Sequence, residues 1–138
     1  MKGFEPNYQE KIGILITNLG TPDNPDPKSL RKYLKQFLSD KRVVDYNRLL
    51  WWLILNVIIL NIRPRKSAKL YESIWTDEGS PLLVNMQSIV QKLQSRNKGV
   101  QIQLGMRYGN PSIEEALNYF KNQNIYKILV LPLYPQAG

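Results

Sequence analysis

The sequence of 138 residues contains no cysteine and no histidine. Without cysteine, the chain cannot form a disulfide, a thiolate metal site or a cysteine nucleophile. The absence of histidine removes the commonest general base and the commonest transition-metal ligand from the available side chains. A metal site built from this chain alone would need oxygen ligands, and we predict no such site.

Several short catalytic and nucleotide-binding motifs are also absent from the sequence. Neither G-x-G-x-x-G nor G-x-x-x-x-G-K-[ST] occurs, which argues against dinucleotide and P-loop sites. There is no G-x-S-x-G elbow, and a serine triad cannot be assembled without histidine. Residues 1–10 are polar and lack the apolar core of a signal peptide, so we expect a cytoplasmic protein.

The composition is that of a globular protein, with 43% hydrophobic and 22% charged residues. The formal net charge of +8 favours an anionic partner, which would be nucleic acid, a lipid surface or an acidic small molecule. A soluble basic domain without a special partner is equally compatible with the charge. The basic residues are dispersed and no nucleic-acid-binding signature is present, so we predict no nucleic-acid partner.

Apolar segments with the pattern of strands alternate with amphipathic segments along the chain. Three are typical of strands, at residues 12–17, 100–104 and 128–131. The segments between them have apolar residues at helical spacing, at residues 27–38, 81–93 and 113–120. This order predicts one α/β domain over residues 1–138, with a Rossmann-like parallel sheet and flanking helices.

Turn and capping residues mark the expected ends of these elements. The first strand is predicted to stop at residues 18–23, which are rich in turn formers. Asp26 is suited to cap the following helix, with Pro27 at its first position. Ser80-Pro81 and Asn110-Pro111 are expected to open the two later helices in the same way.

The segment at residues 49–60 is apolar on nearly every side and does not fit the alternating pattern. As a helix these twelve residues would span roughly 18 Å, which is short of the roughly 30 Å hydrocarbon core of a membrane. With its flanking residues, the apolar helix is expected at about 46–62. It is therefore a buried core helix, an interfacial helix or one wall of an apolar pocket. Paired tryptophans and flanking cations favour the exposed alternatives. The residues expected at a membrane or ligand surface are Leu49, Leu50, Trp51, Trp52 and Leu53.

Ligands of open parallel sheets bind beyond the carboxyl ends of the strands. The residues that follow the three predicted strands are 18–20, 106–108 and 133–136. They combine apolar side chains, two phenols and one arginine, which suit a flat apolar ligand carrying acidic groups. The alternative is that Tyr108 and Tyr134 are ordinary aromatic residues at a sheet edge and Arg107 is a surface residue.

A basic segment at residues 63–71 follows the apolar one. Pro64 is expected in the first turn of a new helix that runs towards Trp75. Arg63 and Lys66 would share one face of that turn, with Tyr71 further along. The segment is either a cationic rim beside an apolar wall or simply a solvated charged face.

The sequence resembles the ferrochelatases, enzymes that insert ferrous iron into a porphyrin. The resemblance runs from about Lys11 to Gln136. It rests on six motifs in order, at residues 18–22, 37–40, 63–71, 78–82, 106–111 and 131–136.

The resemblance implies a porphyrin-binding role for seven residues. Leu19 would pack against the macrocycle near its metal-binding centre. Arg63, Lys66 and Tyr71 would stand at the mouth of the pocket, where cations suit the propionates. The remaining members of the set are Arg107, Tyr108 and Tyr134, which would line the pocket wall. Ferrous iron and porphyrin would be substrates, and no tightly bound cofactor is expected.

The resemblance also implies features of a whole enzyme that this chain lacks. Ferrochelatases carry their proton-accepting histidine and its assisting glutamate in a second, similar α/β domain, so no catalytic residue is predicted here. The expected partners are porphyrin, a membrane surface, and the second domain or a homo-oligomer in its place. The apolar segment resembles the lip of forms that lie peripherally at the inner membrane and take protoporphyrin. A non-catalytic tetrapyrrole-binding or membrane-surface module is the alternative function.

Overall fold

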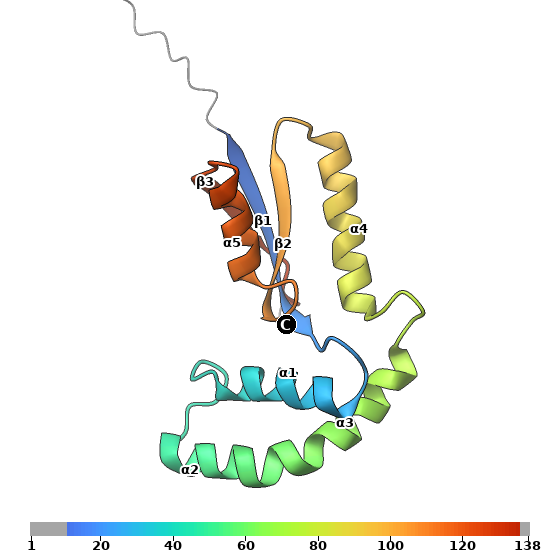
Figure 1. Cartoon of the computed structure of the whole chain (residues 1–138), viewed down its shortest axis with the longest axis vertical. Helices are drawn as coiled ribbons and strands as arrows, with labels where there is room; N and C mark the ends of the chain where they lie inside the picture. The colour runs from blue at the N-terminus through green and yellow to red at the C-terminus, as the bar shows by residue number, and fades with distance from the viewer. Residues whose placement is uncertain (1–10, 136–138) are drawn as a thin grey trace, which may run out of the picture.

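The computed structural model describes residues 11–135, which form an α/β fold around a three-stranded parallel sheet (Figure 1). The sheet order is β2-β1-β3, so the first strand of the chain lies in the middle. The strands are β1 (Ile12–Thr21), β2 (Gln101–Gly109) and β3 (Lys127–Pro132). The helices are α1 (Pro27–Ser39), α2 (Arg48–Leu53), the π-helix η1 (Ile54–Ile59), α3 (Leu60–Ile74), α4 (Pro81–Arg96) and α5 (Ile113–Asn122). The predicted fold class is confirmed.

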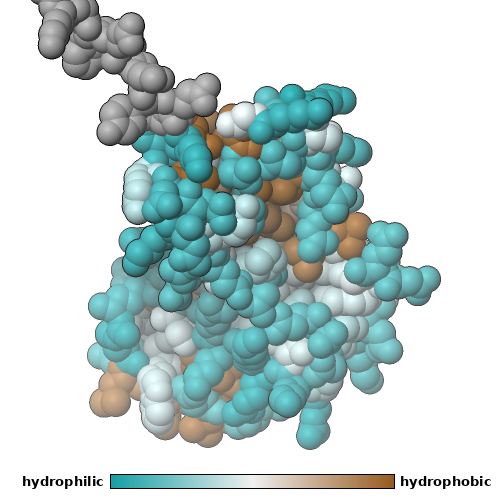
Figure 2. Space-filling view, turned by 45° about the horizontal axis from the view of Figure 1, so that its top comes forward, coloured by the Kyte–Doolittle hydropathy of each residue, from teal (hydrophilic) through white to brown (hydrophobic). Residues whose placement is uncertain are grey.

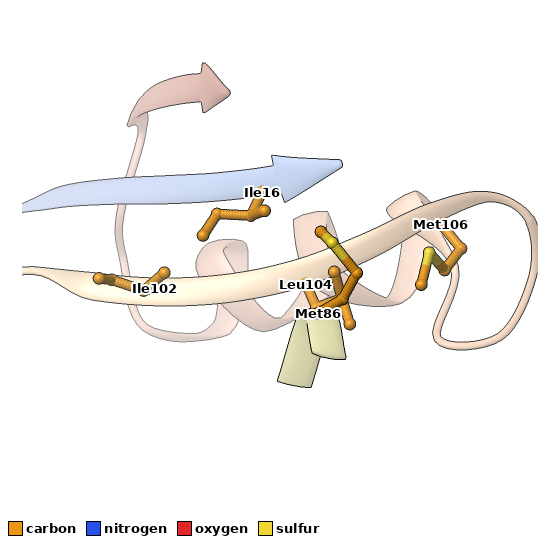
Figure 3. Close-up of a cluster of buried hydrophobic side chains, with 5 residues drawn as sticks. All are labelled: Ile16, Met86, Ile102, Leu104 and Met106. Carbon is orange, nitrogen blue, oxygen red and sulfur yellow. The ribbon is translucent and has the colours of Figure 1, made fainter. Parts of the chain in front are cut away.

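One face of the sheet packs against α4. Side chains alternate between the two faces of a strand, and this face takes Ile16 of β1 together with the even-numbered residues of β2. The buried cluster comprises Ile16, Met86, Ile102, Leu104 and Met106 (Figure 3). Met86 is the member contributed by α4, and it reaches back towards the two strands. This cluster fixes α4 against the central and outer strands.

The opposite face of the sheet packs against α5. Phe120 is fully buried there with Leu15, Ala116 and Ile125. The helix approaches β1 so closely that a Cβ atom on Gly13 would lie 2.7 Å from the ring of Phe120. Glycine at this position therefore lets α5 sit directly on the central strand.

The first strand runs further than the sequence predicts. Residues 18–21 were expected to form a turn, but they continue the pairing of β1 with β2, with Asn18 opposite Met106 and Gly20 opposite Tyr108. Gly20 has a φ of +113°, and a Cβ atom there would lie 1.7 Å from the carbonyl oxygen of Tyr108. The prediction was wrong because the glycine serves a close backbone approach within the sheet instead of a turn.

The expected helix openings are correct at α1 and wrong at α5. Asp26 accepts hydrogen bonds from the backbone N–H groups of Lys28 and Ser29, as predicted. The last helix, however, opens at Ser112, which forms a reciprocal capping box with Glu115. Asn110 lies two residues too early, because the backbone N–H that the cap must satisfy belongs to Glu115.

The helix expected at about 46–62 begins at Arg48 and continues without a break through α2, η1 and α3 to Ile74. Pro64 therefore lies inside a helix and not in its first turn, which corrects the prediction. Proline cannot donate to the carbonyl oxygen of Leu60, four residues earlier. Arg31 of α1 donates to that oxygen instead, over 2.7 Å, and thereby compensates for the proline.

One stripe of this long helix packs on α1, and the rest of its apolar surface is exposed. Leu55 and Leu60 are buried, whereas Leu49 is 80% and Trp52 is 61% exposed. Hydrophobic side chains appear at the lower edge of the molecule in Figure 2, at the end where Figure 1 places α2. Within residues 11–135, no helix is long and apolar enough to cross a membrane.

The third strand is less covered than its apolar sequence predicts. Leu129, Val130 and Leu131 are between 41% and 57% exposed, although such a run is typical of a strand buried on both faces. The reason is topological, since β3 lies at the edge of the sheet and pairs only with β1 in the described part of the chain.

Candidate functional site

The candidate site lies at the carboxyl end of the sheet, where α1 and the long helix cross the ends of the strands (Figure 1). The pairing of Asn18 with Met106 and of Gly20 with Tyr108 places Leu19 beside Arg107. Both of these side chains are exposed. The structure thus brings together two of the predicted porphyrin-binding residues from adjacent strands.

Asn18 joins β1 to the segment that follows β3. Its buried side-chain amide donates 2.8 Å to the carbonyl oxygen of Leu133, and its side-chain oxygen accepts from the N–H of Leu19. The N–H of Leu133 also donates to the carbonyl oxygen of Thr17. These bonds fix the backbone next to Tyr134, which is 39% exposed, and place it near the end of β1. Gln136, expected to follow it at this edge, lies outside the described residues.

Arg107 and Tyr108 share a single carboxylate partner, Asp40, at the end of α1. The guanidinium of Arg107 lies 2.6 Å from Asp40 Oδ2, and the phenol of Tyr108 donates to the same oxygen over 2.9 Å. The ring of Tyr108 is buried against Phe37, with their centroids 5.1 Å apart. The charge of Arg107 is therefore already paired. The buried Tyr108 helps to hold the Asp40 carboxylate in place for this pair.

The environment of Asp40 favours its ionised form. The backbone N–H of Arg42 and the side chains of Arg107 and Tyr108 all donate to its carboxylate, and together they lower its pKa to about 2. This stabilisation is complete above pH 4 and is lost as the pH falls towards 2, because only the ionised carboxylate accepts all three bonds.

We expect the Asp40 carboxyl carbon to titrate in NMR with a midpoint near pH 2 in the wild-type chain. In Arg107→Ala the midpoint should rise but stay below the ordinary value near 3.9, because the Arg42 and Tyr108 donors remain. A midpoint that does not move in this variant would show that the ion pair does not form in solution.

Two further tyrosines connect α1 and α3 with the end of β1. Tyr33 of α1 is buried and its hydroxyl donates to the carbonyl oxygen of Gly20 over 3.2 Å. Burial raises its pKa, and the nearby phenols of Tyr71 and Tyr108 add to the effect. Burial likewise raises the pKa of Tyr71. The phenol of Tyr71 thus lies near that of Tyr33, and its place at the mouth of a porphyrin pocket stays a prediction.

Arg63 and Lys66 lie one to two turns before Tyr71 on α3, and both are exposed to solvent. Among the described residues, neither forms an ion pair. Their charges are therefore available to bind the carboxylate of a ligand, whereas the charge of Arg107 is already paired with Asp40.

An open groove of about 800 Å³ lies beside the Asp40 pair, between α1 and the end of β2. Its volume is in the range of ligand-binding clefts. It is lined by Lys32, Lys35, Gln36, Ser39, Asp40, Arg107, Tyr108, Gly109, Asn110 and Ser112. Leu19, Arg63, Lys66, Tyr71 and Tyr134 are not among these residues. Of the seven predicted residues, the groove is therefore lined only by Arg107 and Tyr108.

Comparison with known proteins gives the family of the chain. The family model described as Ferrochelatase matches residues 11–138, which is nearly the whole sequence. This chain belongs to the ferrochelatase family. The resemblance seen in the six motifs is confirmed.

Curated ferrochelatases of several bacteria are close relatives. The ferrochelatase of Thioalkalivibrio sulfidiphilus is 58% identical over 132 residues, which cover 92% of this chain and 36% of the relative. That of Alcanivorax borkumensis is 56% identical and covers 91% and 38%, respectively. Ferrochelatase 1 of Shewanella oneidensis is 54% identical and covers 91% and 39%. The chain thus spans less than two fifths of the length of these relatives.

Two residues of the site had no role in the sequence-based prediction. Asp40 occurs in one of the six motifs, but its two side-chain partners lie 67 and 68 residues away, and no local pattern reveals them. Gln36, one turn earlier, accepts from the backbone N–H of Gly109 over 2.9 Å. Gln36 in α1 and Asp40 at its C-cap thus both bond to residues at the end of β2.

Metal-ligating side chains do not gather at this site. Within residues 11–135, no group of three or more aspartate, glutamate, histidine or cysteine residues has the arrangement to hold an ion.

Proposed function

We propose that this chain forms the porphyrin-binding part of a ferrochelatase, which inserts ferrous iron into a porphyrin in haem biosynthesis. The observation that carries this proposal is the family match over residues 11–138. Iron and porphyrin act as substrates, and protoporphyrin is the porphyrin proposed. Leu19 would pack on the macrocycle, with Tyr134 beside it at the neighbouring strand end.

The three predicted cations differ in their ion pairing, and we propose different roles for them on this basis. Arg107 is paired with Asp40, so its charge is partly satisfied before any ligand arrives. Arg63 and Lys66 are exposed and have no ion-pair partner in the described chain. We assign the propionates to Arg63 and Lys66, and to Arg107 the task of shaping the wall beside Leu19.

Metal insertion also requires a base that accepts the two pyrrole protons. The sequence contains no histidine, and we propose that the base and its assisting glutamate are supplied by a second ferrochelatase domain or by another subunit in its place. The exposed third strand is a surface on which such a partner could pack.

We expect the 138-residue chain to bind protoporphyrin in an absorbance titration, without inserting iron or zinc above the uncatalysed rate. Arg63→Ala should weaken porphyrin binding about tenfold, since one charge-assisted bond of about 1.5 kcal/mol is lost. Arg65→Ala, which removes a neighbouring charge outside the predicted set, should change binding by less than about twofold. Equal effects of the two variants would contradict the assignment of Arg63. Metal insertion by the chain alone would contradict the proposed need for a second part.

The exposed apolar surface of α2 and η1 favours a second candidate function, a non-catalytic module for tetrapyrroles or membrane surfaces. The membrane contact is common to both functions: in each, Leu49, Leu50, Trp51, Trp52 and Leu53 lie at a membrane surface. Restoration of metal insertion by the remaining part of a related ferrochelatase would favour the enzyme, and its absence would favour the module.

A further inference from the structure

A small pocket opens between α2 and the segment that follows α1. Its volume is about 230 Å³. One wall is the segment after α1, with Lys41, Asp45 and Tyr46, and the other wall is α2, with Arg48 and the paired tryptophans. None of the seven predicted porphyrin-binding residues lines it. The pocket thus adjoins the groove beside Asp40, because Ser39 lines both, but it contains none of the seven residues.

Hydrogen bonds hold both walls of the pocket in place. The indole N–H of Trp51 donates 2.8 Å to the carbonyl oxygen of Leu38, which joins α2 to the end of α1. The N–H groups of Val43 and Val44 both donate to the carbonyl oxygen of Asp40 and close the intervening turn. Leu55, which also lines the pocket, is 2% exposed. The pocket is thus part of the folded chain and does not depend on a ligand to form.

The charged groups around the pocket favour a phosphate. Lys41 and Arg48 are exposed, and neither forms an ion pair within residues 11–135. Asp45 is the only acidic residue of the lining, so the local charge is positive. The phenol of Tyr46 is a further donor on the same wall. Ammonium, guanidinium and phenol donors suit the oxygen atoms of a phosphate monoanion.

The surface next to the pocket is strongly apolar. Leu49, Trp52 and Leu53 of α2 are 80%, 61% and 51% exposed, and Val57 and Ile58 of η1 are more than half exposed. Such a patch next to cations and indoles is typical of a helix that lies in the headgroup region of a membrane. A free phosphate would use the cations and leave the apolar patch without a partner.

We propose that this pocket binds the phosphate of a membrane phospholipid, while the exposed side chains of α2 and η1 enter the acyl region beside it. Lys41 and Arg48 contact the phosphate oxygens, and Trp52 lies at the level of the headgroups. The proposal rests on the membrane contact included in the proposed function, and it identifies the lipid group that is recognised and the residues that bind it.

Sedimentation with phosphatidylcholine vesicles containing phosphatidylglycerol tests the pocket. The double variant Lys41→Ala/Arg48→Ala should bind about thirtyfold more weakly than the wild type, since each cation near the surface contributes about a factor of five. The charge-matched variant Arg65→Ala/Lys69→Ala, on exposed positions of α3, should lose less than about threefold. Trp52→Ser should also weaken binding. Equal losses in both double variants, or no binding by the wild type, would overturn the proposal.

A soluble short-chain phosphatidylglycerol and inorganic phosphate distinguish a lipid site from a phosphate site. The lipid should shift the NMR signal of the Trp51 indole N–H saturably, and the shift should disappear in Lys41→Ala/Arg48→Ala. An equal shift with inorganic phosphate alone would overturn the assignment to lipid. The same double variant should bind protoporphyrin as tightly as the wild type. This titration tests the porphyrin proposal independently of the lipid proposal.

Discussion

Replacing Gly20 by alanine is expected to prevent stable folding of the chain. A Cβ atom at this position would lie 1.7 Å from the carbonyl oxygen of Tyr108, and the φ of +113° is one that L residues rarely adopt. Relief requires β1 and β2 to separate where the candidate site is built. We expect a loss of more than about 4 kcal/mol in urea denaturation, which is exceptional for a single substitution.

Gly79→Ala is the matched control for this experiment. Gly79 has a similar φ of +121°, but within residues 11–135 no atom other than those of Gly79 and its two chain neighbours lies within 4 Å of the position that its Cβ would take. Only backbone strain of about 1–2 kcal/mol should then be measured. If the free energy of unfolding decreased by the same amount in both variants, the close approach of β1 and β2 at Gly20 would be absent in solution.

Phe120→Ala is expected to have the second largest effect. Phe120 is 0% exposed and packs between α5 and the central strand, against the space that Gly13 leaves open. Removal of a buried ring leaves a cavity and costs about 3–5 kcal/mol. Because α5 leads directly to β3, the loss should also loosen the segment that carries Tyr134. Urea denaturation followed by far-ultraviolet circular dichroism measures the change.

Leu117→Ala provides the comparison within the same helix. Leu117 is 43% exposed, so its truncation should cost less than about 1 kcal/mol, although both residues lie on α5. Equal losses for the two substitutions would mean that α5 does not pack on the sheet through Phe120.

The α/β fold could be predicted because its signals are local. Three apolar segments alternate with amphipathic helices, and a parallel sheet with crossover helices satisfies that order with few alternatives. Asp26 and Pro27 mark a helix start that the structure confirms. The family could be predicted as well, because its motifs are contiguous segments of sequence.

The predictions that failed depended on contacts between distant segments. Residues 18–21 contain turn formers, but strand pairing with residues 106–109 supplies the hydrogen bonds that a turn would otherwise make. Pro64 is compatible with a helix interior because Arg31, 29 residues before Leu60, satisfies the carbonyl oxygen that proline leaves without a donor. Neither partner can be identified from the local sequence.

The sequence by itself determined the fold class, the ferrochelatase family and the chemical character of the residues at the sheet end. Only the tertiary structure decided which of their charged side chains are paired within the chain and which are exposed to solvent. It pairs Arg107 with Asp40 across 67 positions of sequence, and it leaves Arg63 and Lys66 exposed. The physical reason is that side-chain chemistry is local, whereas ion pairing and burial depend on which distant elements meet when the chain packs.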